Sequence, residues 1–120
     1  MSFKIVVAGS RDYCDYKKAK EYINLCICGI ENKDTVIFLS GGCRGADMLG
    51  ERYAIENGYD IKKYPADWKK YGAAAGPIRN REMAKEADMI ICFWDGLSKG
   101  TKSLIDYAIK FEKNIKIKMI

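Results

Sequence analysis

Residues 36–47 read VIFLSGGCRGAD, an apolar run followed by three glycines and an arginine. A short apolar run bounded by glycine is typical of a buried strand in a parallel sheet. The residues after it have helical spacing, with apolar or small side chains at Ala46, Leu49, Gly50, Tyr53 and Ala54. The stretch therefore predicts a strand, a glycine loop and a helix, which form the first half of a βαβ unit.

The same alternation extends along the whole chain. We expect strands over residues 4–8, 35–39, 59–64, 88–94 and, at a sheet edge, 115–120. Helices are expected from residue 16 to about 30, from 46 to 58, from 77 to about 87 and over 101–113. This order predicts an α/β fold, a Rossmann-like three-layer sandwich with a mainly parallel sheet of about five strands, and one domain over residues 1–120.

Two details of this prediction concern individual residues. Residues 65–77, PADWKKYGAAAGP, are expected to form a long loop with one helical turn, and Pro77 to open the next helix. In the last helix, the spacing of the apolar residues predicts an inward face made of Leu104, Ile105, Ala108 and Ile109.

The composition excludes several functional classes. The 120 residues contain no histidine, which excludes Ser-His-Asp and Cys-His catalysis and histidine metal sites. Five cysteines without a C-x-x-C pair indicate free thiols in a reducing compartment. No apolar run approaches the ~18 residues of a membrane span. The opening MSFKIVVAGS reads as a strand and not as a signal peptide. We therefore expect a cytoplasmic protein with no membrane contact, metal or cofactor.

The loops that follow the strands carry the polar residues expected of a site. Ligands of open α/β sheets bind at the carboxyl ends of the strands. Arg44, Arg79 and Lys99 lie near predicted helix N-termini, where a cation is unfavourable unless an anion binds too. Glycines 41, 42, 45, 96 and 100 would let backbone N–H groups approach a phosphate. The loops thus predict an anion-binding site.

A plain structural reading of these loops stays open. Neighbouring acids could pair with the cations: Asp12 with Arg11, Asp47 with Arg44 and Asp95 with Lys99. The loops also match neither G-x-G-x-x-G nor the P-loop pattern. The net charge of +5 is spread over the chain, which is compatible with an anionic ligand but does not indicate a nucleic-acid groove.

Six sequence motifs taken together carry a family resemblance. KIVVAGSRD, LSGGCRGAD, YPADW, GPIRNREM, AD and FWDGLSKGT follow one another over nearly the whole chain. This set resembles the small, single-domain YspA-like group of the SLOG superfamily, named for its SMF/DprA and LOG members. The resemblance implies a Rossmann-like fold that binds nucleotides or nucleotide-derived ligands, and relatives that often form homo-oligomers.

The LOG branch of this superfamily cleaves the N-glycosidic bond of nucleoside monophosphates. Arg79 and Met83 match its arginine and methionine, and Gly100-Thr101 matches its glycine-threonine step, but Leu104 stands at the position of its glutamate. A hydrolase of this type would need another carboxylate. The catalytic candidates are Arg79, Asp47, Asp67 and Asp95.

Three functional hypotheses follow. The first is a module that binds a nucleotide-derived, ADP-ribose-like small molecule for sensing or sequestration, with Trp68 or Asp67 facing its base or ribose. The alternative is a LOG-like phosphoribohydrolase. DprA-like binding of single-stranded DNA comes third, because the lysines near Trp68 read better as a solvated surface. The predicted ligand-binding residues are Gly9, Ser10, Arg11, Gly41, Gly42, Arg44, Gly45, Asp47, Asp67, Trp68, Arg79, Asn80, Asp95, Gly96, Ser98, Lys99, Gly100 and Thr101.

Overall fold

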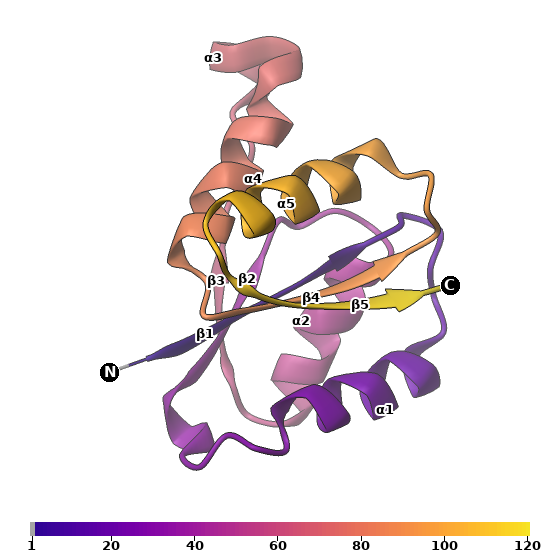
Figure 1. Ribbon diagram of the computed structural model, residues 1–120, viewed down its shortest axis with the longest axis vertical. Coiled ribbons are helices and arrows are strands. Elements are labelled where there is room, and N and C mark those ends of the chain that lie inside the picture. The colour runs from indigo at the N-terminus through magenta and orange to yellow at the C-terminus, as the bar shows by residue number, and fades with distance from the viewer. Residues whose placement is uncertain (1) are drawn as a thin grey trace.

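The computed structural model describes residues 2–120 and contains a five-stranded parallel sheet between two layers of helices (Figure 1). The strand order is β3-β2-β1-β4-β5, with β1 at the centre. This confirms the predicted Rossmann-like α/β fold. The strands are β1 (Phe3–Gly9), β2 (Val36–Ser40), β3 (Asp60–Lys63), β4 (Met89–Trp94) and, at one edge as predicted, β5 (Asn114–Met119).

Two pairs of long helices cover the two faces of the sheet (Figure 1). One face carries α1 (Tyr16–Ile27) and α2 (Ala46–Glu56), and the other carries α4 (Ala75–Glu86) and α5 (Lys99–Lys110). Alternate residues of β1 enter the two cores, because successive side chains of a strand point to opposite faces. Ile5 and Val7 belong to the α1–α2 core, and Val6 and Ala8 to the α4–α5 core.

The segment before α4 is more helical than the sequence predicts. Residues 65–77 were expected to form mainly a loop, but they contain the short helix α3 (Trp68–Tyr71) and the 3-10 helix η2 (Gly72–Ala74). A second 3-10 turn, η1 (Lys33–Thr35), precedes β2. Helix α4 then begins at Ala75, so the expectation that Pro77 opens it was wrong by two residues. A proline is tolerated there because the first four N–H groups of a helix have no intrahelical acceptor.

The buried face of the last helix differs in one residue from the predicted one. Leu104, Ile105 and Ala108 are buried as predicted, but Ile109 is 64% exposed. Helix α5 packs over β4 and β5 at the edge of the sheet, and its outer flank has no covering element among residues 2–120 (Figure 1). Its buried stripe is therefore narrower than the apolar pattern indicates. No helix in the described part of the chain is long and apolar enough to cross a membrane.

A glycine inside α2 determines how closely that helix approaches the sheet. In a helix interior, glycine costs roughly 1 kcal/mol relative to alanine. At Gly50, however, a Cβ would lie only 2.5 Å from the Cβ of Val7 on β1. The glycine thus lets α2 pack tightly on the central strand, with Asp47 in the first turn of α2 near the carboxyl end of the sheet.

Candidate functional site

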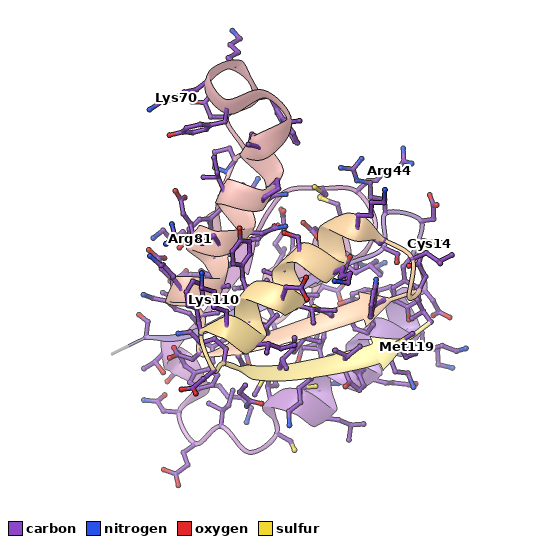
Figure 2. The ribbon with its side chains drawn as sticks, turned by 45° about the horizontal axis from the view of Figure 1, so that its top comes forward. Cys14, Arg44, Lys70, Arg81, Lys110 and Met119 are labelled. Atoms are coloured by element: carbon purple, nitrogen blue, oxygen red, sulfur yellow. The ribbon has the colours of Figure 1, made fainter. Side chains whose placement is uncertain are left out.

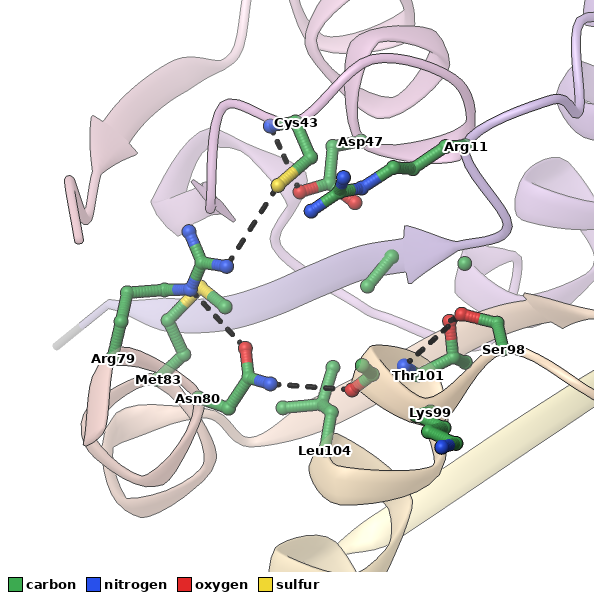
Figure 3. A pocket seen from close by; sticks show the side chains of 13 residues that line it. Arg11, Cys43, Asp47, Arg79, Asn80, Met83, Ser98, Lys99, Thr101 and Leu104 are labelled. Atoms are coloured by element: carbon green, nitrogen blue, oxygen red, sulfur yellow. Dashed lines mark hydrogen bonds between the residues drawn. The ribbon is translucent and has the colours of Figure 1, made fainter. Parts of the chain in front are cut away.

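A cavity of about 270 Å³ opens at the carboxyl ends of β1 and β4, where the strand order reverses (Figure 3). This is the position at which open α/β sheets bind ligands. We call it the α5 cavity, because the first turn of α5 forms one of its walls. Its lining consists of Ala8, Gly9, Arg11, Cys43, Asp47, Arg79, Asn80, Met83, Ser98, Lys99, Gly100, Thr101 and Leu104.

The α2 side of the cavity presents a buried carboxyl group. Asp47 is only 6% exposed, and its Oδ2 accepts a hydrogen bond from the Cys43 N–H at 3.3 Å. Burial raises the pKa of Asp47 to about 6, although the Cys43 N–H and the guanidinium groups of Arg79 and Arg11 act in the opposite direction. Asp47 can therefore gain or lose a proton near neutral pH.

The glycine loop between β2 and α2 is held by acceptors of the chain itself. The Gly42 N–H donates to Ser40 Oγ at 3.1 Å, and the Cys43 N–H donates to Asp47. Ser40 Oγ in turn lies 2.6 Å from Glu51 Oε2 in the protein interior. In this conformation the two N–H groups already have partners, so the loop contributes the Cys43 side chain to the cavity wall, beside Asp47 of α2.

Arg79 joins α4 to the loop after β2 (Figure 3). Its Nη1 donates to the Gly41 carbonyl at 2.7 Å, its Nε donates to Asn80 Oδ1 at 3.1 Å, and its Nη2 lies 3.7 Å from Cys43 Sγ. Most of its donors are thus used inside the chain, while its positive charge stabilises the ionised form of Asp47. Arg79 lies in the second turn of α4, because the helix begins earlier than the sequence predicts.

The first turn of α5 forms the opposite wall. Ser98 caps the helix by accepting the Thr101 N–H, and Asn80 Nδ2 donates to the Gly100 carbonyl at 3.2 Å, which links α4 to α5. The N–H groups of Lys99 and Gly100 have no acceptor within the helix, because they belong to its first turn. This end of the helix dipole favours an anion.

Asp95 holds the loop that leads into α5. Its Oδ1 accepts the N–H groups of both Leu97 and Ser98 at 2.8 Å, and these two hydrogen bonds lower the pKa of the Asp95 carboxyl. Asp95 does not line the α5 cavity. Its carboxylate sets the path of the chain from β4 into the wall that faces a ligand.

The structure gathers half of the predicted ligand-binding residues around one cavity. The nine that line it are Gly9, Arg11, Asp47, Arg79, Asn80, Ser98, Lys99, Gly100 and Thr101. The other nine lie outside its lining: Ser10, Gly41, Gly42, Arg44, Gly45, Asp67, Trp68, Asp95 and Gly96.

Arg44 and Trp68, which were predicted to bind the ligand, have exposed side chains outside the cavity lining. The Arg44 side chain is 76% exposed at the periphery and pairs with Asp12 at 3.6 Å, not with Asp47 (Figure 2). Trp68 is 55% exposed on α3, which projects from the body of the molecule, and Asp67 caps the same short helix (Figure 1).

Sequence reasoning left out four lining residues, namely Ala8, Cys43, Met83 and Leu104. Helical spacing could have indicated two of them. Met83 lies four residues after Arg79, and Leu104 three residues after Thr101, so each shares a helix face with a predicted site residue. Leu104 therefore gives the cavity an apolar wall where the LOG pattern has a glutamate.

The comparisons with known proteins agree with this fold. Residues 3–71 match the YspA, cpYpsA-related SLOG family, and the chain belongs to that family. The gene 61 protein of Mycobacterium phage D29 is 35% identical over an 81-position alignment that covers 62% of this chain and 65% of the phage protein. The chain thus matches somewhat less than two thirds of that relative's length.

Two solved structures share the architecture at low sequence identity. The DNA processing protein A (DprA) of Streptococcus pneumoniae superposes on 98% of this chain with a TM-score of 0.72 and 18% identity, and the match covers 50% of DprA. The structural genomics target TM1055 superposes on 96% of this chain with a TM-score of 0.66 and 17% identity, and the match covers 72% of TM1055. At such identities the likeness concerns the fold alone.

Proposed function

We propose that the α5 cavity binds the phosphorylated ribose of a nucleotide-derived ligand, for sensing or sequestration. The observation that carries the proposal is the convergence of a helix N-terminus and the cations Arg11 and Lys99 on one cavity, opposite the buried carboxyl of Asp47. At about 270 Å³, the cavity lies just below the ~300–1,000 Å³ range of small-molecule sites. It suits a sugar phosphate better than a whole dinucleotide.

The phosphate belongs at the first turn of α5. The N–H groups of Lys99 and Gly100 and the hydroxyl groups of Ser98 and Thr101 supply donors there, and the Lys99 ammonium adds charge. Arg11 approaches from the loop after β1. In the β2–α2 loop, by contrast, the N–H groups of Gly42 and Cys43 already have acceptors in the chain.

The sugar belongs in the middle of the cavity. Asp47 can accept hydrogen bonds from ribose hydroxyl groups. Ala8, Met83 and Leu104 offer apolar contact to the carbon face of the ring.

A ligand screen with a matched pair of variants tests this function. Thermal unfolding is followed with ribose 5-phosphate, AMP, ADP-ribose and inorganic phosphate, since a ligand at a hundred times its Kd adds about 2.7 kcal/mol of stability. Calorimetry then compares Arg11→Ala with Arg44→Ala. Both variants remove one loop arginine, but only Arg11 lines the cavity. We expect Arg11→Ala to weaken binding about tenfold and more than Arg44→Ala. No shift with any of these compounds would contradict the proposal.

Asp47 favours hydrolysis as a second candidate function. It contributes the one carboxylate among the lining residues, and its pKa is raised to about 6, the range of a general base. In that reaction Asp47 would take a proton from water, and the water oxygen would bond to C1′ of the ribose. The C1′–N bond would break with its electron pair going to the base, which would leave after its nitrogen takes up a proton from solvent. Chromatography of AMP after incubation detects the free base. Asp47→Asn should abolish its release while binding remains.

A further inference from the structure

A second and larger cavity lies at the same edge of the sheet, on the side of α1. Its volume is about 830 Å³, well within the ~300–1,000 Å³ range of small-molecule sites. The start of α1, the loop before it and the end of β5 surround it, with Tyr13, Tyr22, Leu25 and Met119 among its lining residues. Met119 marks this end of β5 in Figure 2. We call it the α1 cavity.

The two cavities share one thin wall. In the loop after β1, Gly9 and Arg11 line the α5 cavity, while Ser10 and Asp12 line the α1 cavity. The loop after β4 is divided in the same way, because Asp95 lines the α1 cavity and Ser98 lines the α5 cavity. The Asp95 N–H donates to Ser10 Oγ at 3.3 Å and joins the two loops. The same two loops therefore line both cavities.

The α1 cavity has a different chemistry from its neighbour. Four acidic side chains line it, Asp12, Asp15, Glu21 and Asp95, against two lysines, Lys18 and Lys118. This acidic balance disfavours a phosphate, and the carboxylates of Asp15 and Glu21 can accept hydrogen bonds from ribose hydroxyl groups. Tyr13 and Tyr22 offer aromatic surface, and each is held by ring contacts with Phe93 at 5.2 and 5.7 Å between centroids. Leu25, 71% exposed, adds apolar surface. These groups suit an uncharged nucleoside.

We propose that the ligand is a dinucleotide or a similar diphosphate-linked molecule, and that the α1 cavity takes its second, uncharged nucleoside half. This inference rests on the proposed function, because it places the phosphorylated ribose of the same molecule in the α5 cavity. The diphosphate crosses the shared wall beside Arg11. The base lies against Tyr13 or Tyr22, and its ribose faces Asp15 or Glu21.

The test compares ribose 5-phosphate, which fills the α5 cavity alone, with ADP-ribose, which also carries a second nucleoside for the α1 cavity. Calorimetry gives the Kd of ribose 5-phosphate and of ADP-ribose for the wild-type chain and for Tyr13→Leu and Tyr22→Leu. Stacking of one base on an aromatic side chain accounts for about a tenfold gain in affinity. We expect ADP-ribose to bind at least about tenfold more tightly, and each leucine variant to reduce that gain without changing the affinity for ribose 5-phosphate. Tyr107→Leu is the matched control, since Tyr107 lines neither cavity.

A measurement on the unmodified chain covers the case in which a variant fails to fold. In two-dimensional NMR spectra, ADP-ribose should shift the resonances of Leu25, Tyr22 and Met119, and ribose 5-phosphate should leave them in place. Equal affinity for the two probes would overturn the inference while the proposed function stands. So would a gain that survives both leucine variants without shifts at these residues. If neither probe binds, the proposed function fails and the inference fails with it.

Discussion

Arg79 donates a hydrogen bond from Nη1 to the carbonyl oxygen of Gly41 at 2.7 Å, between residues 38 positions apart. A Cβ at residue 41 would lie 2.7 Å from the same Nη1 atom. The structure thus gives a steric reason for a glycine at this position. The glycine leaves space for the guanidinium that ties α4 to the loop after β2.

The first prediction concerns this contact. Gly41→Ala should displace the guanidinium of Arg79 and lower the free energy of unfolding by about 1.5–3 kcal/mol, the contribution of a hydrogen bond to a charged group. Urea unfolding measures the loss. Gly29→Ala is the control, because a Cβ at Gly29 meets no atom within 4 Å. Equal, small effects of the two substitutions would show that the Arg79 contact contributes nothing to stability.

Asp47 should make the stability of the chain depend on pH. Its pKa rises from 3.8 to about 6 on folding, so the folded chain holds this proton more tightly than the unfolded chain. The stability it contributes is fully present below pH 4 and is lost as the pH rises towards 6. One pKa unit corresponds to about 1.4 kcal/mol, which makes the loss roughly 3 kcal/mol.

Asp47→Asn isolates that contribution. Asparagine keeps an oxygen that can accept the Cys43 N–H but carries no charge, so the variant should gain stability relative to the wild-type chain between pH 4 and 7. Thermal unfolding of both chains across this range gives the difference, in which all other titrating groups cancel. A constant difference from pH 4 to 7 would mean that the pKa of Asp47 is not raised.

The buried pair of Ser40 and Glu51 gives a third prediction. Ser40 Oγ accepts the Gly42 N–H and donates to Glu51 Oε2, so the two side chains hold the glycine loop as one unit. Glu51→Ala should cost about 1–3 kcal/mol, because it leaves a buried hydroxyl without its acceptor. Ser40→Ala added to Glu51→Ala should cost less than the sum of the single changes. If the costs of the two single substitutions simply add in urea unfolding, Ser40 and Glu51 do not hold the loop as one unit.

The strand and helix pattern was enough to predict the fold, because buried parallel strands and amphipathic helices leave strong periodic signals. The observed bounds of the helices differ from the predicted ones where those signals are weak. Pro77 fits any early position of a helix, so it could not fix the start of α4 at Ala75. Ile109 continues the apolar spacing of α5, and only the position of that helix at the sheet edge leaves it exposed.

The site was predictable as a set of loops but not as a set of side chains. Arg44 is an example. Gly45 has φ of +84°, and the Ala46 N–H donates to the Ser10 carbonyl, which fixes the loop so that Arg44 faces Asp12. Neither the sign of φ nor this long-range hydrogen bond can be read from the sequence. The same turn places Cys43 in the cavity wall.

Asp95 gives the last prediction, with a pH dependence opposite to that of Asp47. Two N–H donors stabilise its charged form, so its pKa in the folded chain lies below the ordinary 3.8. The stability it contributes is present above pH 4 and is lost as the pH falls through the lowered pKa. Asp95→Ala should therefore unfold at a lower temperature than the wild-type chain at pH 7, and the gap should narrow towards pH 3.

Asp95→Asn separates charge from geometry in this loop. The amide oxygen can still accept the N–H groups of Leu97 and Ser98, so this variant should fall between wild type and Asp95→Ala at pH 7. Because the Asp95 loop positions Ser98 at the start of α5, Asp95→Ala should also weaken the binding of ribose 5-phosphate, although Asp95 does not line the α5 cavity. If Asp95→Ala is destabilised equally at pH 3 and pH 7, the charge of Asp95 does not hold the loop. If Asp95→Ala binds ribose 5-phosphate as tightly as the wild-type chain, the Asp95 loop does not position the phosphate site.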